Sequence, residues 1–177
     1  MTIKVLEKTE GCFPQEFEIG DWYDLSTAED IVLKAPHAKM LHKHKNGEVV
    51  DRIRDVVFDT TLIPLGVAIE VPKGYEAHLL PRSGTFKKWG IIQTNSKGII
   101  DRSFMGDNDE WKLPVLATRA ITIPKGTRIA QFRITLSQKA TSIQKIKWLL
   151  NNKPKLIKVE CLGNKDRKGI GEGTGDK

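Results

Sequence analysis

Short apolar runs, each closed by a turn signal, limit most strongly how this chain can fold. Pro-Lys-Gly turns stand at 72–74 and 124–126. The runs are rich in Val, Ile and Leu, often alternate with polar residues, and cover 3–8, 29–34, 66–71, 75–80, 114–118 and 128–134. Short strands separated by such turns are typical of a sandwich or barrel and not of alternating strand–helix units. The sequence therefore predicts an all-β domain.

The composition is that of one globular domain. The chain has 177 residues, of which 39% are hydrophobic, enough to bury a single core. No apolar run approaches the ~20 residues of a membrane span, and the N-terminus lacks the apolar core of a signal peptide. Cys12 and Cys161 lie far apart and form no CxxC pattern, which favours free thiols in a reducing compartment. We expect a single cytoplasmic domain over 1–177 with no membrane partner.

The net charge of +7 indicates an anionic partner. The basic residues form separate patches at 39–45, 87–88 and 153–158, without recurring aromatic residues. Nucleic-acid sites normally gather basic residues on one face, and single-strand sites add stacking aromatics. Nucleic acid is therefore not the expected partner, and a polyanionic small molecule such as a nucleoside triphosphate accounts for the charge equally well.

Residues 98–106, GIIDRSFMG, form the most informative motif. A β-branched run ends at Asp101, Phe104 follows three residues later, and a glycine closes each end. We expect a tight hairpin that brings backbone groups, a carboxylate and a ring to one small pocket. Such a set can hold a base and a sugar and aim a water at a phosphate. A turn aspartate that caps its own backbone is the alternative interpretation.

A second motif, PRSGTFKKWG at 81–90, has the pattern of a short capped helix. Ser83 is a good N-cap and Gly90 suits the position after the last turn. The N-terminus of such a helix can bind an anion through the backbone N–H groups of Gly84 and its neighbour, with help from Ser83 and Arg82. Short capped helices without ligands are also common, so the pattern alone leaves both interpretations open.

With three further motifs, these two resemble the trimeric dUTP diphosphatase (dUTPase) family of phage and bacterial type in order and spacing. The further motifs are DWYDL at 21–25, KGTRIAQF at 125–132 and DRKGIGEGTG at 166–175. The resemblance implies a distorted jelly roll or β-barrel with one short helix. It also implies a homotrimer whose sites are built from more than one subunit, the C-terminal arm 164–177 being flexible and arriving from a neighbour.

The resemblance further implies hydrolysis of dUTP to dUMP and pyrophosphate with Mg²⁺. Asp101 would activate the water that attacks the α-phosphate. Asp24 would hold Mg²⁺ through water, which suits a hard cation that keeps its waters. The implied substrate-binding residues are Arg82, Ser83, Gly84, Asn95, Gly98, Ile100, Phe104, Gln131 and Arg167.

Several of these residues have implied roles in particular parts of the nucleotide. Gln131 would contact the phosphate chain and Arg167 would reach the γ-phosphate. The amide of Asn95 would read uracil, since an amide offers both a donor and an acceptor. Phe104, where the family usually has Tyr, would lie against the deoxyribose and leave no room for a 2′-hydroxyl.

The chain departs from the family pattern near the base and near the metal. Ile170 stands where the family commonly has an aromatic residue that covers the uracil, and Asp21-Trp22 replaces the usual Ala-Gly. Trp111, in the polar run GDNDEW, is the candidate to cover the base in its place. The alternative is that Trp111 packs at a subunit interface, which Trp often does.

Two segments look like additions to the family pattern. Residues 36–55 predict a β-ribbon that turns at Asn46-Gly47. Its histidines, His37, His42 and His44, lack the Cys or carboxylate partners of a zinc site, so a solvated basic hairpin is expected. Residues 139–158 suggest an extended arm or a small subunit contact.

Two other functions remain open from the sequence. A dCTP deaminase on the related fold would need a carboxylate beside the base, and the strand PVLAT at 114–118 carries no Glu. A regulatory protein that senses a nucleotide on the same fold is the second alternative.

Overall fold

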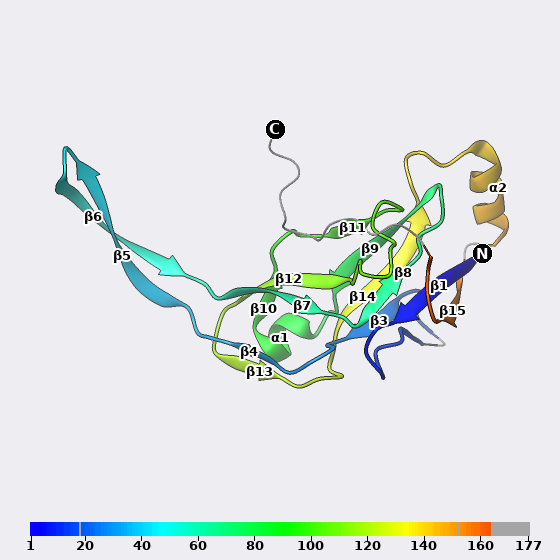
Figure 1. Ribbon diagram of the computed structural model, residues 1–177, viewed down its shortest axis with the longest axis horizontal. Coiled ribbons are helices and arrows are strands. Elements are labelled where there is room, and N and C mark those ends of the chain that lie inside the picture. The colour runs from blue at the N-terminus through cyan, green and yellow to red at the C-terminus, as the bar shows by residue number, and fades with distance from the viewer. Residues whose placement is uncertain (18, 152, 164–177) are drawn as a thin grey trace.

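The computed structural model describes residues 1–17, 19–151 and 153–163. Most of its secondary structure is strand, gathered into a body from which a two-stranded ribbon projects at one end, while a helix lies at the other end (Figure 1). The β architecture expected from the short apolar runs is confirmed. Neither helix in the described part of the chain is long and apolar enough to span a membrane.

The largest sheet brings together segments that are far apart in the sequence. Its order is β11-β9-β14-β3-β2, and all neighbouring strands are antiparallel. The strands are β2 (Gln15–Glu16), β3 (Tyr23–Ser26), β9 (Tyr75–Pro81), β11 (Gly98–Ile100) and β14 (Arg128–Leu136). Because four of the five sequence motifs lie on these strands or directly after them, this sheet positions the candidate site.

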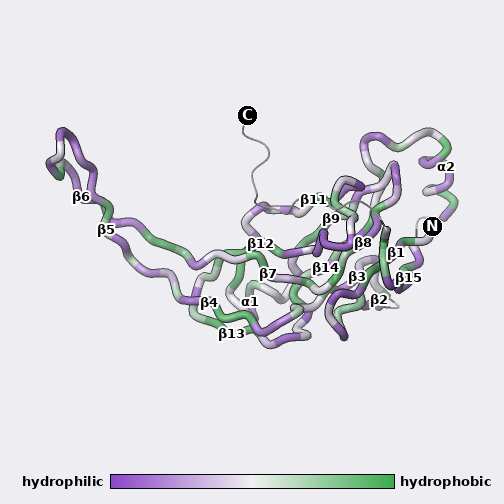
Figure 2. The backbone as a smooth tube through the Cα atoms, in the orientation of Figure 1, coloured by the Kyte–Doolittle hydropathy of each residue, from purple (hydrophilic) through white to green (hydrophobic). Residues whose placement is uncertain are grey.

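Three smaller sheets complete the body. Their orders are β10-β12-β7, β15-β1-β8 and β13-β4, and β1 is parallel to β15. The strands are β1 (Thr2–Glu7), β4 (Ile31–Leu33), β7 (Thr60–Pro64), β8 (Val67–Ile69), β10 (Ile91–Gln93), β12 (Lys112–Ala117), β13 (Ile121–Ile123) and β15 (Lys155–Val159). Apolar stretches run mainly along the strands of the body (Figure 2).

Aromatic side chains lie in the core between these sheets. Trp111 and Phe132 are fully buried and meet edge to face, with ring centroids 5.1 Å apart. Tyr23 stacks on Phe132 with a centroid distance of 5.3 Å. Edge-to-face and offset stacked pairs are the favourable aromatic geometries, so these three rings link β3 and β14 to the segment before β12.

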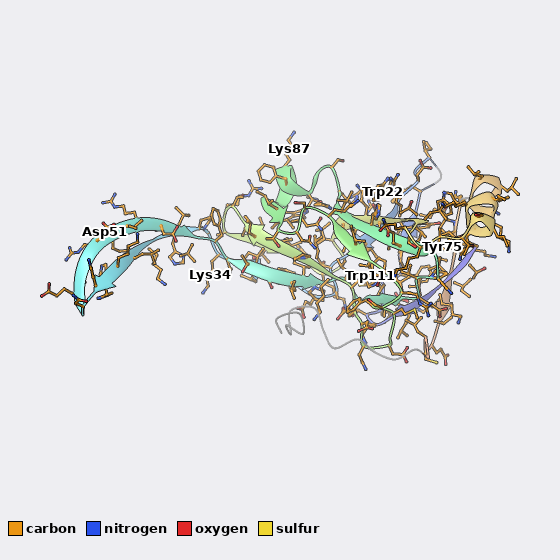
Figure 3. All side chains as sticks on the ribbon, turned by 90° about the horizontal axis from the view of Figure 1, so that it is seen from above. Trp22, Lys34, Asp51, Tyr75, Lys87 and Trp111 are labelled. Atoms are coloured by element: carbon orange, nitrogen blue, oxygen red, sulfur yellow. The ribbon has the colours of Figure 1, made fainter. Side chains whose placement is uncertain are left out.

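The expectation that Trp111 covers a ligand is wrong. Its side chain is fully buried inside the body (Figure 3). Its backbone N–H donates to the Val67 carbonyl, and its own carbonyl accepts from the Leu65 N–H. The subunit-interface alternative is also wrong, because these contacts lie within one chain. The residues beside Trp111 in the sequence are polar, so the local sequence does not indicate that distant strands enclose this side chain.

Replacing Trp111 with Ala should lower the free energy of unfolding by about 3–5 kcal/mol, because it empties a large space in the core. Urea unfolding followed by circular dichroism measures this. Trp148→Ala is the matched control, since Trp148 is only partly buried and its ring meets Tyr75 at 5.7 Å. An equal loss in both variants would contradict the core assignment of Trp111.

The chain has a second helix that the sequence analysis did not predict. Besides α1 (Thr85–Trp89), residues 139–158 contain α2 (Ser142–Leu150). Thr141 and Gln144 form a capping box: the Gln144 N–H donates to Thr141 Oγ1, and the Thr141 N–H donates to Gln144 Oε1. A Thr three residues before a Gln is the sequence signature of such a start, so the signal was present.

The predicted ribbon is formed by β5 (His37–Lys45) and β6 (Glu48–Val57), which are antiparallel. Its turn residues Asn46 and Gly47 have φ values of 53° and 86°. Two consecutive positive φ values define the hairpin turn that Asn-Gly favours. The ribbon therefore follows from its local sequence.

Candidate active site

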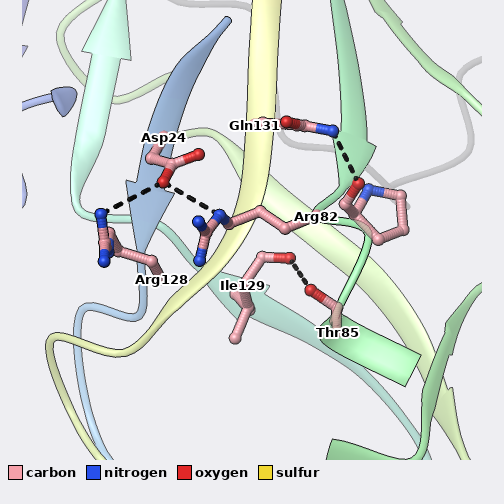
Figure 4. Close-up of polar contacts among 7 residues, drawn as sticks. Asp24, Arg82, Thr85, Arg128, Ile129 and Gln131 are labelled. Carbon is pink, nitrogen blue, oxygen red and sulfur yellow. Dashed lines mark hydrogen bonds and ion pairs between the residues drawn. The ribbon is translucent and has the colours of Figure 1, made fainter. Parts of the chain in front are cut away.

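An ion-paired carboxylate lies on the outer face of the largest sheet. Asp24 on β3 is 5% exposed and pairs in register with Gln131 of β14. Its Oδ2 atom is 2.9 Å from Nε of Arg82 and 3.5 Å from Nη1 of Arg128 (Figure 4). A buried carboxylate needs such partners, since an unpaired buried charge is costly. Two guanidinium groups around one carboxylate leave this group of side chains with a net positive charge.

A bulge in β14 lets two polar side chains share that outer face. The register with β3 shifts between Arg128 and Ala130, so Ile129 and Ala130 are both buried while Arg128 and Gln131 are only partly buried. Regular alternation would place residues three apart on opposite faces. The extra residue of the bulge therefore brings Arg128 and Gln131 to the same side, where Gln131 Nε2 donates to the Pro81 carbonyl at 3.2 Å.

The same bulge anchors the turn that follows β9. The Ile129 carbonyl accepts from the Arg82 N–H at 3.1 Å and from Thr85 Oγ1 at 2.7 Å. Thr85 is 3% exposed, so this contact is shielded from water. Arg82 is consequently fixed at both ends, by its backbone to β14 and by its guanidinium to Asp24. Thr85 was not singled out by the sequence analysis.

The helix after this turn begins one residue later than predicted. Gly84, not Ser83, is the N-cap of α1, and no side chain caps the helix. A Cβ atom on Gly84 would meet no atom within 4 Å, so the space beside it is open, and Ser83 is exposed. Gly90 ends the helix with φ 63°, as expected for its left-handed position.

A hollow beside α1 is lined largely by cations. Arg82, Lys87, Lys88 and Arg128 contribute to its wall together with Thr85, and no carboxylate is among the described residues that line it. Anions concentrate in such a hollow, because its walls carry positive charge and have a low dielectric constant. The arrangement suits a phosphate chain. Arg128, which the sequence analysis did not assign to chemistry, is part of it.

Tyr23, next to Asp24, points into the core and stays a hydrogen-bond donor. Its hydroxyl donates to the Pro154 carbonyl at 2.5 Å. Burial raises the pKa of Tyr23 to about 12, so the phenol remains neutral throughout the ordinary pH range. The contact fixes β3 to the segment before β15 and so supports the position of Asp24.

Asn95, expected to contact uracil, lies between β10 and β11, and Gly98 is the first residue of β11. Asn95 Oδ1 accepts from Gln93 Nε2 at 2.7 Å, and the same nitrogen is 3.3 Å from the Leu79 carbonyl. Gly98 pairs with Leu79, and a Cβ atom on Gly98 would lie 3.1 Å from that of Leu79, so a larger residue would crowd the strands. Gln93, which sequence reasoning missed, thus orients Asn95.

The expected hairpin at 98–106 is wrong. Only Gly98–Ile100 are strand, as β11, and they pair with β9 instead of with the residues that follow. Asp101 begins a turn: its Oδ1 accepts from the Ser103 N–H at 2.9 Å, and its carbonyl accepts from the Phe104 N–H at 3.1 Å. The self-capping interpretation of Asp101 is therefore correct for its local structure, and the side chain remains exposed.

Asp101 and Arg82 lie at opposite ends of β9. In the antiparallel register Ile100 pairs with Ala77 and Gly98 with Leu79, so Asp101 falls beside Glu76 while Arg82 follows Pro81. The six residue steps from Glu76 to Arg82 span roughly 20 Å of extended chain. One chain alone therefore does not bring the carboxylate of Asp101 to the cationic hollow.

Phe104 and Ile100 belong to the core, each 8% exposed. This burial leaves little of the Phe104 ring to lie against a sugar, so the expected stacking role is not supported by this conformation.

Arg167 and the arm 164–177 lie outside the described residues. Asp24, Arg82 and Gln131 are thus brought together, whereas Asp101 is placed apart from them.

Comparison with known proteins gives the family. The family model described as dUTPase matches residues 48–153. The SPbeta prophage-derived deoxyuridine 5′-triphosphate nucleotidohydrolase YosS of Bacillus subtilis (strain 168) is 42% identical over 175 residues, covering 99% of this chain and 97% of that protein. The chain belongs to the dUTPase family. A second family member, from Finegoldia magna, is 32% identical over 178 residues and 98% of this chain.

Solved dUTPase structures share the fold. The dUTPase from Streptococcus mutans superposes with a TM-score of 0.57 at 19% identity, covering 77% of this chain and 95% of that one. The dUTPase from phage phi11 of S. aureus, described with a species-specific insert, gives a TM-score of 0.57 at 18% identity over 80% of this chain and 94% of its own.

Proposed function

We propose that this dUTPase hydrolyses dUTP to dUMP and pyrophosphate in a site shared between copies of the chain. The observation that carries the proposal is the cationic hollow at one end of β9, with Asp101 about 20 Å away at the other end. Each chain would give its hollow to one site and its Asp101 to another. Staphylococcus phage 80alpha dUTPase, which shares the fold, has been solved with the analogue dUpNHpp.

The hollow supplies the positive charge that phosphoryl transfer requires. Arg82 and Arg128 would bind the triphosphate, and Gly84, Lys87 and Lys88 also line the hollow. Ser83 follows Arg82 in the chain, and Gln131 is hydrogen-bonded to the Pro81 carbonyl that precedes Arg82. Arg82 is held by Asp24, so its other N–H groups have a fixed direction. Such positioning and charge compensation provide most of the catalysis in phosphoryl transfer. Arg167 would add a further cation from the C-terminal arm.

Asp101 of a neighbouring copy would remove a proton from the attacking water. The carboxylate is exposed at the edge of the body, so a neighbour can present it to another chain's hollow. The water would attack the α-phosphorus in line with the departing pyrophosphate. From the same neighbour, Asn95 and the backbone of Gly98 and Ile100 would bind the uracil ring.

The residues present fit Mg²⁺ that is held mainly by the substrate. Within the described ranges, no group of three or more His, Cys, Asp or Glu side chains is placed to hold a metal ion. Mg²⁺ in nucleotide sites commonly uses one or two carboxylates, with substrate phosphates and waters as the other ligands. Asp24 beside the cationic hollow would meet that need through water. When bound, the ion would neutralise phosphate charge; the phage phi11 dUTPase is described with a structural Mg(II) ion.

Assembly as a homotrimer of jelly-roll subunits is supported by an apolar outer face. On the β10-β12-β7 sheet Ile92 pairs with Leu116, and Pro114 pairs with Leu62. Ile92 and Leu62 are exposed in the single chain. A contiguous exposed apolar stripe marks a protein contact, and a closed ring of three copies would cover it on every subunit.

A substrate panel tests the function. The protein is incubated with Mg²⁺ and dUTP, dCTP or UTP, and the products are separated by chromatography. We expect dUMP and pyrophosphate from dUTP, with little reaction of the other two. Formation of dUTP from dCTP would identify a deaminase instead. Binding of dUTP without any product would identify a nucleotide-sensing protein.

A further inference from the structure

The register of the ribbon sorts its charged side chains onto two different faces. Residues that pair directly across an antiparallel ribbon point to the same face, and successive pairs alternate. One face, here called the lysine face, carries Lys39 opposite Asp55, Lys43 opposite Asp51, and Lys45 opposite Glu48. The other, here called the arginine face, carries Met40 opposite Arg54, His42 opposite Arg52, and His44 opposite Val49.

The two faces therefore differ in charge. On the lysine face each cation stands across from a carboxylate, so the charges compensate. On the arginine face Arg52 and Arg54 have no carboxylate across from them, and the described part of this face holds no acidic residue. The register shift between Lys43 and His44 leaves this division intact. In the sequence the same residues alternate, which hides the separation.

Both faces of the ribbon are open to solvent over the described residues from His37 to Val56. All described side chains from His37 to Val56 are exposed, and the ribbon extends away from the body (Figures 1 and 3). An isolated two-stranded ribbon is marginally stable in water. Exposed apolar residues on the arginine face, Met40 and Val56, add to that cost. A ribbon of this kind gains stability from a partner.

We propose that the arginine face of the ribbon binds double-stranded DNA, lying in the major groove. That groove admits a two-stranded β-ribbon. Arg52 and Arg54 are two residues apart on β6, so their Cα atoms are about 7 Å apart, close to two base-pair steps of roughly 3.4 Å each. A face with arginines and no carboxylate complements the phosphates and the acceptor groups of guanine.

The size of the ribbon favours a groove over a flat protein surface. Nine paired residues extend about 30 Å, and one face of two strands covers only some 300 Å². A stable protein–protein contact usually needs about 800 Å² on each partner. A groove that encloses the ribbon contacts its edges as well as one face. The expectation from sequence that nucleic acid is not a partner is thereby revised for this segment.

Fluorescence anisotropy of a labelled DNA duplex of about 20 base pairs, roughly two helical turns, tests the proposal. Binding is measured from low to moderate salt with the intact protein. Arg52→Ala combined with Arg54→Ala should weaken binding about tenfold and reduce the slope of log K against log salt by roughly 1.8. The matched control, Lys39→Ala with Lys43→Ala, removes the same charge from the other face and should change binding less than twofold.

Further variants and probes decide between the remaining outcomes. Arg52→Lys with Arg54→Lys keeps the charge and should keep most of the salt slope. A retained slope would show that the Ala pair weakens binding by removing charge and not by unfolding the ribbon. Equal losses in the two Ala pairs would overturn the proposal in favour of general electrostatics. Binding of a poly-glutamate peptide but not of DNA would make the partner an acidic protein. A changed molar mass of the protein with Arg52→Ala and Arg54→Ala would indicate that the ribbon lies between subunits instead of on DNA.

Discussion

Replacing Asp101 with Asn should abolish turnover of dUTP while leaving its binding nearly unchanged. The amide keeps the shape of the side chain and can still accept from the Ser103 N–H, but it cannot take a proton from water. Loss of a general base lowers kcat by about 10²–10⁴-fold. Steady-state kinetics and calorimetric titration with a non-hydrolysable dUTP analogue measure the two effects separately.

Asp51→Asn is the matched control for this change. Asp51 is also exposed and also accepts a backbone N–H, that of Arg52, but it lies on the ribbon far from the hollow. Its substitution should leave kcat within about twofold, since surface changes away from the chemistry have small effects. If Asp101→Asn kept more than a tenth of the activity, Asp101 would be a turn residue only.

We expect two inactive variants to restore activity to each other when they assemble together. In a shared site, one subunit supplies Asp101 and another supplies Arg82. The Asp101→Asn chain lacks the base, and the Arg82→Ala chain lacks the phosphate contact. After the two are unfolded, mixed in equal amounts and refolded, about a quarter of the sites would combine an intact Asp101 with an intact Arg82. The measurement is dUTP hydrolysis before and after refolding, with each variant refolded alone as the control.

Absence of any recovered activity in the mixed sample would contradict the shared site. That result would require Asp101 and Arg82 to meet within one chain, against the register that separates them along β9. Light scattering on the same sample reports the molar mass. A monomer at micromolar concentration would likewise exclude the shared arrangement.

Local signals in the sequence predicted the elements whose structure is decided locally. The strands predicted at 75–80 and 128–134 are present as β9 and β14. The left-handed Gly90 and the Asn46-Gly47 turn are present as well. All of these depend on residue type and alternation. The start of α2 is also local, because the Thr141–Gln144 capping box is visible in the sequence.

Features that depend on distant strands could not be read in this way. Trp111 has polar neighbours in sequence but is enclosed by the core. The segment after Ile100 does not fold back as a hairpin, because β11 finds its partner in β9. The grouping of Asp24, Arg82 and Gln131 needs three strands in register, and without the family resemblance no local pattern would have joined them.

The contact between Asp24 and Arg82 also decides when the Arg82 side chain loses its rotamer entropy. A free arginine side chain has about 2 kcal/mol of rotamer entropy, which a ligand must remove if it is to hold the group still. In this protein the guanidinium already rests on Asp24 and the backbone of Arg82 on Ile129. Much of the disorder of this donor therefore disappears during folding, and an arriving phosphate meets a side chain that has little left to lose.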